Sequence, residues 1–314
     1  MTISRLLPSA RLRNSILSIA VYDPLYKLAV APYRSTSRRL RKALFRAAMR
    51  APAMLLHCNA GGEEYLVDSR DRVISQSLFV TGTYDFEKFE MAVRLLKQFA
   101  AVGDGLHLID VGSNVGSVCI PAVNRGYSKS ATAIEPNPNN CRLLRVNLAL
   151  NGLSESISVI ECALGDGSTS TLDLELADEN FGDHRIRTTS DVGMMGEHLR
   201  RTISVRSRTL DEVRAPEAGG EALIWMDVQG YEGFVLAGAK AWLKRGTPVC
   251  LEFWPYGLKR ARSYEMVKSA FDRYRGFIDL NCGTETRLRP ITELDNLYAE
   301  LGEGDRFTDL LLVG

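Results

Sequence analysis

Seven short apolar runs, separated by helical stretches, limit the folds open to this chain. The series begins with LHLIDV at 106–111, ATAIE at 131–135 and SVIEC at 158–162, and it continues with ALIWMDV at 222–228, VCLEFW at 249–254, GFIDLN at 276–281 and RFTDLLLVG at 306–314. The runs lack the polar–apolar alternation of a half-exposed strand, so they indicate strands buried on both faces. We therefore expect an α/β fold with a doubly wound, mostly parallel sheet of seven strands.

The chain before the first of these runs divides into two regions. Residues 1–60 are expected to form a basic, mainly helical extension, and residues 61–105 a connecting region. Within the connecting region, short β-type runs at 64–85 predict a hairpin, and the stretch 86–100 predicts a helix. The core then spans 106–314.

Charge is distributed unevenly along the sequence. Residues 1–50 contain eleven lysines or arginines and one acid, Asp23, so this segment carries +10; the whole chain carries +1, which leaves −9 for the rest. Residues 35–50 combine Leu40 and Leu44 with basic side chains at helical spacing, which predicts a basic amphipathic helix. Such a helix either packs on the acidic body or docks on a membrane surface or an acidic partner. The near-neutral total gives no indication of nucleic-acid binding.

The cysteines and histidines indicate no metal site. The six cysteines form no CxxC pair, and the four histidines lack metal-ligand spacing. Most cysteines lie in apolar runs, which is typical of reduced, buried side chains in a cytoplasmic protein. No apolar stretch approaches the ~20 residues of a membrane span. We expect a cytoplasmic protein, with peripheral contact at the inner membrane surface as an alternative for the basic segment.

The first strand of the core ends at Asp110, and a glycine turn follows it. This turn, Gly112-Ser113-Asn114-Val115-Gly116, precedes a helix, as in sites where ligands bind at the carboxyl ends of parallel strands. A dinucleotide fingerprint would have glycine in place of Asn114, so a pyrophosphate would be crowded here. Asp110 would repel a polyanion and suits a sulfonium or ammonium group. A plain tight turn is the alternative interpretation.

The ends of the next strands supply further candidates for a nucleoside site. Glu135 follows the glycine turn by ~20–25 residues, the separation at which an acid accepts the hydroxyls of a ribose. Cys162 and Ala163 would let a flat adenine lie against the backbone. Asp227 would orient the ligand's amino group or take a proton from a substrate hydroxyl, unless it caps the following helix. Together these residues predict a ligand that is adenosine-like and cationic, as S-adenosylmethionine is.

A long polar insert at 164–221 is expected to select the substrate. It contains ENFGDHRIR at 179–187, and inserts at this edge of a sheet carry substrate contacts or a lid. His184 is the second candidate base beside Asp227. Asp227 and Glu252 could meet at the sheet edge, but nothing in their spacing requires a metal. The candidate substrate-binding residues are Asn180, Asp183, Arg185 and Glu252.

Five motifs follow one another in the order DVGSNVGSV, AIEPNPNNCRLLRVNLALNG, CALGD, NFGDHR and MDVQGYEGFVLAGA. In this combination, over roughly residues 75–255, the chain resembles the FkbM family of S-adenosylmethionine-dependent methyltransferases. The resemblance implies a Rossmann-like class I methyltransferase fold and O-methylation of a hydroxyl on a small molecule or glycan. It also implies that Asp227 lies near the methyl group. The chain departs from the family's DxEGxE pattern at Gln229. The residues that the resemblance assigns to the cofactor pocket are Asp110, Gly112, Asn114, Gly116, Glu135 and Asn137.

Two other functions remain as alternatives. A nicotinamide-dependent oxidoreductase is disfavoured by Asn114, which stands where a dinucleotide fingerprint has its middle glycine. A non-catalytic module that binds S-adenosylmethionine, or a scaffold, is disfavoured by the intact acids Asp110, Glu135 and Asp227.

Overall fold

The structure is a computed structural model that describes residues 37–51, 54–99, 105–213, 221–281 and 286–314. The predicted N-terminal extension is therefore described from residue 37 onward, and its first 36 residues lie outside the description. Within the described residues, no helix combines the length and the apolarity needed to cross a membrane.

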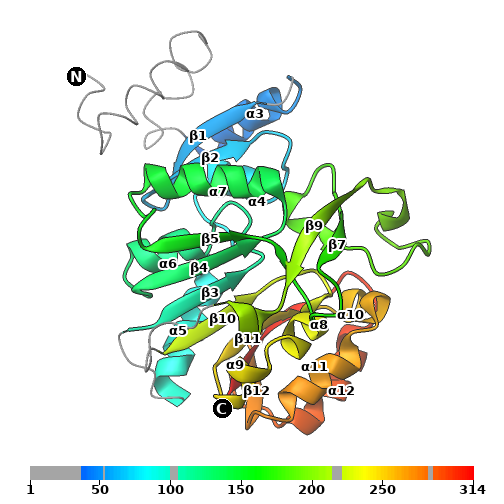
Figure 1. The fold of residues 1–314 in the computed structure, drawn as a ribbon. Coiled ribbons are helices and arrows are strands. Elements are labelled where there is room, and N and C mark those ends of the chain that lie inside the picture. Colours follow the sequence, from blue (N-terminus) through cyan, green and yellow to red (C-terminus); the bar gives the residue numbers. More distant parts are fainter. Residues whose placement is uncertain (1–36, 52–53, 100–104, 214–220, 282–285) are drawn as a thin grey trace.

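A seven-stranded sheet forms the centre of the molecule, and all seven predicted strands are confirmed (Figure 1). Every neighbouring pair is parallel except the two pairs made by β13, which runs antiparallel to both neighbours. The order reverses between β3 and β10, so a crevice is expected at their carboxyl ends. Across the sheet the strands are β12 (Gly276–Asp279), β13 (Thr308–Val313), β11 (Val249–Phe253), β10 (Ala222–Met226), β3 (His107–Val111), β4 (Ser130–Glu135) and β5 (Ile157–Glu161).

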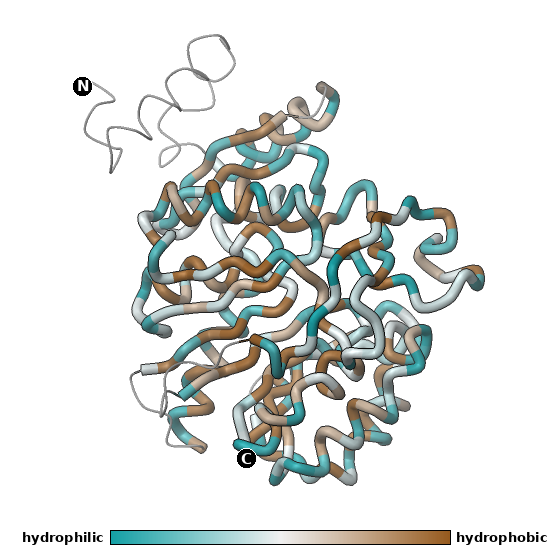
Figure 2. The backbone as a smooth tube through the Cα atoms, viewed as in Figure 1, coloured by the Kyte–Doolittle hydropathy of each residue, from teal (hydrophilic) through white to brown (hydrophobic). Residues whose placement is uncertain are grey.

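Helices cover both faces of this sheet, as the continuous apolar strands require. Successive strand residues belong to two separate cores: Leu108 packs on one face and Ile109 on the other. Figure 2 shows hydrophobic residues concentrated along the central strands. One face is covered by α5 (Phe86–Phe99), α6 (Cys119–Asn124) and α7 (Pro138–Leu150). The other is covered by α8 (Glu232–Ala237), α9 (Lys240–Lys244), α10 (Pro255–Ala261), α11 (Tyr264–Phe271) and α12 (Leu294–Leu301), which the 3-10 helix η6 (Ile291–Glu293) precedes.

The polar insert forms a small sheet of its own. The order of its strands is β6-β9-β7-β8, and Ala163, Leu174 and Val205 form a minor core beneath them. Figure 1 shows β7 and β9 beside the large sheet. The elements are β6 (Ala163–Leu164), β7 (Thr171–Glu175), β8 (Arg185–Ile186) and β9 (Thr202–Arg208), with the 3-10 helices η3 (Phe181–Asp183), η4 (Glu197–Leu199) and η5 (Leu210–Glu212).

The region before the core is partly different from the prediction. The basic helix is present as α3 (Arg38–Ala48); it buries Phe45 and Ala48 and leaves most of its basic side chains exposed. The hairpin, however, begins within the segment predicted to be helical: it pairs β1 (Leu55–Ala60) with β2 (Glu63–Asp68). Its turn is Gly61-Gly62, whose positive φ angles of 67° and 118° are those that glycine favours in hairpins.

The segment after β2 is helical rather than extended. Asp71 accepts hydrogen bonds from the backbone N–H groups of Val73 (3.1 Å) and Ser75 (2.8 Å), and these bonds start α4 (Ile74–Val80). The short β-type runs in this segment predicted strands, but the side chain of Asp71 instead binds N–H groups where the helix begins and so favours a helix.

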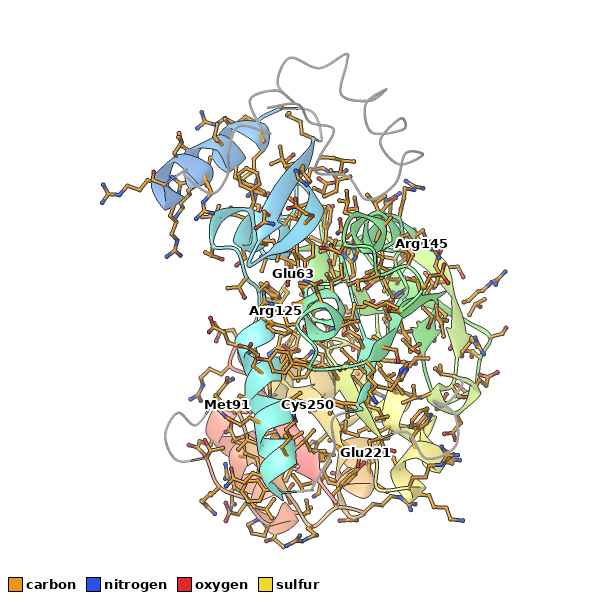
Figure 3. All side chains as sticks on the ribbon, turned by 90° about the vertical axis from the view of Figure 1, so that its left-hand side faces the viewer. Glu63, Met91, Arg125, Arg145, Glu221 and Cys250 are labelled. Carbon is orange, nitrogen blue, oxygen red and sulfur yellow. The ribbon has the colours of Figure 1, made fainter. Side chains whose placement is uncertain are left out.

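Asparagine side chains fasten the hairpin to α7. Asn147 accepts from the N–H of Leu66 (2.7 Å) and donates to the carbonyl of Val115 (3.0 Å). Asn151 bonds both backbone groups of Glu64 (2.9 and 2.7 Å). On the hairpin's other side Glu63 pairs with Arg125 at 2.7 Å, and Figure 3 shows these two side chains together. The hairpin is therefore part of the folded core.

Replacing Asn147 by alanine is expected to destabilise the protein strongly. Asn147 is fully buried, and its loss leaves one N–H and one carbonyl without a partner, at a cost of about 2–4 kcal/mol. Urea unfolding measures the change. The exposed Asn139 of the same helix is the control: Asn139→Ala should change stability by less than about 0.5 kcal/mol. Equal effects would contradict this account of the hairpin.

Candidate active site

A cavity of about 400 Å³ lies at the carboxyl ends of β3, β4, β10 and β11, against the polar insert. Two residues predicted to line the site, Gly116 and Asn137, are not among its lining residues. The predicted residues that do line it are Asp110, Gly112, Ser113, Asn114, Glu135, Cys162, Ala163, Asn180, Asp183, His184, Arg185, Asp227 and Glu252.

The glycine turn is shaped by the close approach of two strands. At Gly112 φ is 87°, and a β-carbon there would lie 2.1 Å from the carbonyl oxygen of Asp227. A side chain at residue 112 would thus push β3 and β10 apart at the crevice. Gly116 lies behind the turn, where a β-carbon would meet Ile120 and Leu144 at 2.6 and 2.8 Å. Gly116 therefore brings the turn close to α7 and does not contact the cavity.

Asn114 and Glu135 join the first two strand ends. Asn114 has a left-handed backbone (φ 49°), which asparagine tolerates better than most residues, and its N–H donates to Glu135 Oε2 at 2.9 Å. The other carboxylate oxygen, Oε1, accepts from the N–H of Asn137 at 2.8 Å. Burial raises the pKa of Glu135 to about 7. Oε1 also accepts from the side chain of Asn140 at 3.4 Å, whereas Oε2 has one donor and keeps a lone pair for another, such as a ligand hydroxyl.

Asn137 acts from outside the cavity. Its side-chain oxygen accepts from the N–H groups of Asn139 and Asn140, so it caps the first turn of α7. Because its own N–H holds Glu135, it positions the carboxylate instead of meeting the ligand.

Several polar atoms around the turn have no protein partner. Within the described residues, Ser113 Oγ and Asn114 Oδ1 are buried without a hydrogen bond. Asp110 accepts from the N–H of Cys119 at 3.2 Å, and burial raises its pKa to about 7. Since buried polar atoms without partners are costly, the turn is suited to a ligand that supplies polar groups.

His184 lines the cavity but is poorly suited to act as a base. Its Nδ1 accepts from the N–H of Ala177 at 3.0 Å, so the neutral ring carries its proton on Nε2. Burial lowers the pKa of His184 to about 4. A ring with this tautomer donates a hydrogen bond and does not accept a proton near neutral pH. Of the two predicted bases, the geometry favours Asp227.

The other predicted substrate residues of the insert are engaged in its own architecture. Asn180 accepts from the N–H of Gly182 at 3.1 Å and begins η3. Arg185 pairs with Asp183 and with Glu197 (3.0 Å), and its guanidinium lies 4.9 Å from the Trp254 ring. These contacts hold the insert in place, so a substrate would meet a preorganised wall.

Asp227 and Glu252 lie together at the ends of β10 and β11. The side-chain nitrogen of Gln229 is 2.7 Å from Asp227 Oδ1 and 2.9 Å from Glu252 Oε2. Burial raises the pKa of Asp227 to about 6 and raises that of Glu252 well above its ordinary range. Asp227 is accessible from the cavity, but protein surrounds it on its other sides.

Sequence reasoning missed several polar residues that line the cavity beside Asp227 and Glu252. Tyr84 lies just before α5, Lys88 lies in its first turn, and Asp309 lies opposite Glu252 in the β11–β13 pair. Lys88 pairs with Asp309 at 2.7 Å. An aspartate inside the otherwise apolar run of β13 was the available indication of Asp309, whereas Tyr84 and Lys88 had none.

Glu232 is a buried carboxyl just outside the cavity. Its Oε1 accepts from the N–H groups of Val228 (3.1 Å) and Gly230 (3.2 Å), while Oε2 has no hydrogen-bond partner among the described residues. Burial raises its pKa from 4.5 to about 7. The stability that the protonated carboxyl contributes is full below pH 4.5 and is lost as the pH rises through the folded-state pKa.

Glu232→Gln should flatten the pH dependence of stability. The amide keeps the accepting oxygen and cannot ionise, so the free energy of unfolding should fall by roughly 3 kcal/mol less than in the wild type between about pH 4.5 and 8. Urea unfolding at the two pH values measures this. The exposed Glu155→Gln controls for the substitution itself. A pH dependence identical to that of the wild type would show that Glu232 does not titrate in this range.

Comparison with solved structures finds proteins of low sequence identity. The C-terminal domain of precorrin-6Y C5,15-methyltransferase from Rhodobacter capsulatus is 12% identical, with 71% of this chain and 86% of that chain covered and a TM-score of 0.35. Precorrin-6y C5,15-methyltransferase from Geobacter metallireducens is 12% identical, with 72% and 86% covered and a TM-score of 0.36. An RNA methyltransferase from Salinibacter ruber, in complex with S-adenosyl-L-homocysteine, is 14% identical, with 52% and 74% covered and a TM-score of 0.27.

A search of curated protein sequences finds no significant match. The family model of the methyltransferase FkbM domain, however, matches residues 110–284. That range begins at the acid that ends β3 and includes the glycine turn, the insert, and the ends of β10 and β11. It covers more than half of the chain and every predicted site residue. The chain therefore belongs to the FkbM methyltransferase domain family.

Proposed function

We propose that this protein transfers a methyl group from S-adenosylmethionine to a hydroxyl of a small molecule or glycan. The observation that carries the proposal is that one cavity joins the glycine turn and Glu135 to the acid at the end of β10, Asp227. The first two features suit a nucleoside, and Asp227 suits the chemistry of a hydroxyl.

The residues around the turn fit the proposed cofactor. Glu135 would accept the ribose hydroxyls, and its Oε2, which has a single protein donor, keeps a lone pair for them. The unpartnered atoms Ser113 Oγ and Asn114 Oδ1 would meet polar groups of the ligand. Cys162 and Ala163 offer a buried, apolar wall for adenine. When bound, the cofactor supplies a methyl group on a positively charged sulfur.

Asp227 is the proposed base. The reacting hydroxyl loses its proton to Asp227 as its oxygen bonds to the methyl carbon, while the carbon–sulfur bond breaks and its electrons remain on sulfur. A pKa of about 6 leaves Asp227 ionised at neutral pH and close to the range in which a base works well. Binding of both reactants in the cavity would hold them in line and displace water from around them.

Asn114 argues against a dinucleotide in this site. Its side-chain nitrogen donates to the carbonyl of Phe181 at 2.9 Å, so the residue links the turn to the insert. In a dinucleotide site this position is a glycine, which leaves space for the pyrophosphate, whereas here the side chain of Asn114 fills that space. This argues against a nicotinamide-dependent oxidoreductase, because its cofactor contains a pyrophosphate.

The part of the cavity around Asp227 and Glu252, here called the acceptor half, favours a hydroxyl-rich ligand. The carboxyl groups of Asp227, Glu252 and Asp309 can exchange hydrogen bonds with hydroxyls, and the rings of Trp254 and Phe307 offer flat surfaces for the apolar faces of a sugar. This composition supports the choice of a polyol or glycan as acceptor.

Calorimetry with S-adenosylmethionine and with NAD tests the cofactor, and transfer of labelled methyl to a panel of hydroxylated acceptors tests the reaction. We expect micromolar-range binding of S-adenosylmethionine, no binding of NAD, and transfer to at least one acceptor. Absence of binding would refute the proposal, and binding without transfer across the panel would favour a non-catalytic module.

Glu135→Ala should weaken S-adenosylmethionine binding by roughly 10- to 100-fold, because hydrogen bonds to a charged group are worth about 1.5–3 kcal/mol. The matched control is Glu161→Ala, since Glu161 lies beside Glu135 in the β4–β5 pair but is exposed and pairs with Arg145. Calorimetry compares the two. Similar losses in both variants would mean that the ribose contact is wrongly assigned.

A further inference from the structure

Gln229 joins the carboxyl groups that end β10 and β11. A primary amide has two N–H groups, so the single nitrogen 2.7 Å from Asp227 and 2.9 Å from Glu252 donates to both. The backbone at Gln229 is left-handed, with φ at 57°. This conformation is unfavourable for a non-glycine residue and persists where the surroundings enforce it, often at functional sites.

The bridge leaves one oxygen of each carboxyl group open. Within the described residues, Asp227 Oδ2 and Glu252 Oε1 make no hydrogen bond, and both residues line the cavity. These two oxygens are therefore the ones that a ligand would meet.

The charges around the pair are mostly negative. Asp309 lies opposite Glu252 on β13, Asp85 and Lys88 lie at the start of α5, Glu232 begins α8, Asp110 ends β3, and the Tyr84 hydroxyl is nearby. Lys88 is the one cation in this set, and it pairs with Asp309.

This environment gives the two carboxyl groups different pKa values. Burial, followed by the charges of Asp227 and Glu232, raises the pKa of Glu252 well above its ordinary range. Asp227, with the amide of Gln229 favouring its charged form, has a pKa of about 6. Of the two carboxyl groups, Glu252 is therefore the one that holds a proton more readily, and Asp227 the one that ionises more readily. Because Oε2 of Glu252 accepts from Gln229, a proton on Glu252 would lie on Oε1, toward the cavity.

We propose that Gln229 is a positioning residue that presents Asp227 as a hydrogen-bond acceptor and Glu252 as a donor to two neighbouring oxygens of the methyl acceptor. The inference rests on the proposed function and narrows its substrate class to hydroxyls with a second oxygen on the adjacent carbon, such as vicinal diols. The reacting hydroxyl gives its proton to Asp227. Glu252 donates a hydrogen bond to the second oxygen and keeps its proton throughout.

Titration of the side-chain carboxyls by ¹³C NMR tests the pair without a known acceptor. In the wild type, Glu252 should remain protonated at neutral pH while Asp227 titrates near 6. Gln229→Met keeps the side-chain length but removes both N–H groups, so the pKa of Asp227 should rise by roughly 1. Gln76→Met, at a half-buried position on α4 that does not line the cavity, should leave both titrations unchanged.

The outcomes separate this inference from the proposed function. An ionised Glu252 at neutral pH in the wild type would overturn the inference, as would an unchanged Asp227 pKa in a folded Gln229→Met protein. Calorimetry with S-adenosylmethionine on the same samples reports on the proposed function independently, since Gln229 does not belong to the cofactor half.

A second test compares methyl acceptors that differ only in the neighbouring hydroxyl. Methyl glucoside should be methylated about 10-fold or more faster than its 2-deoxy and 3-deoxy analogues, in which a neighbouring hydroxyl is missing. Glu252→Gln retains a neutral donor and should keep this preference, whereas Glu252→Met should lose it. Equal rates for diol and deoxy acceptors in the wild type would contradict the proposed pair.

Discussion

The site depends on how closely the carboxyl ends of β3 and β10 approach each other. The carbonyl oxygen of Asp227 lies only 2.1 Å from the position that a β-carbon on residue 112 would take, so only a glycine permits this approach. This approach brings the turn that begins with Gly112 against the acid that ends β10. It thereby sets the separation between the half of the cavity suited to a nucleoside and the half suited to an acceptor.

A second junction holds the walls of the cavity to this centre. The backbone of Phe181, in the insert, donates to Asp71 at 3.3 Å and accepts from the side chain of Asn114 at 2.9 Å. Asp71 in turn starts α4, beside the hairpin that Asn147 fastens to α7. The N-terminal region, the glycine turn and the insert thus meet at one residue. Asn114 serves this junction through its bond to Phe181, which gives a physical reason for asparagine at a position where dinucleotide sites have glycine.

The sequence predicted what is locally determined and missed what depends on distant contacts. All seven strands of the large sheet were predictable because continuous apolar runs need burial on both faces. The acids at strand ends, Asp110, Glu135 and Asp227, were predictable because parallel strands place their carboxyl ends at one edge. Tyr84 and Lys88 were not, since nothing in their own segment indicates that α5 reaches the cavity. The tautomer of His184 is fixed by a backbone N–H that only the fold brings to it, so nothing in the sequence indicates that the ring is poorly suited to act as a base.

Gln229 shows how one departure from a family pattern acquires meaning in three dimensions. In the sequence it is a neutral residue where many relatives have an acid. In the structure its amide lies between two buried carboxyl groups that would otherwise repel each other. In the proposed arrangement it lets one of them ionise while the other retains its proton, which is the division of roles that a base and a neighbouring donor require.

A crystal structure of the protein with S-adenosylhomocysteine bound would test the central claim most directly, because that claim concerns which half of the cavity holds which reactant. The account predicts ribose hydroxyls on Glu135, adenine against Cys162 and Ala163, and the sulfur facing Asp227 and Glu252. A nucleoside bound with its ribose away from Glu135, or with its sulfur directed away from Asp227, would contradict it.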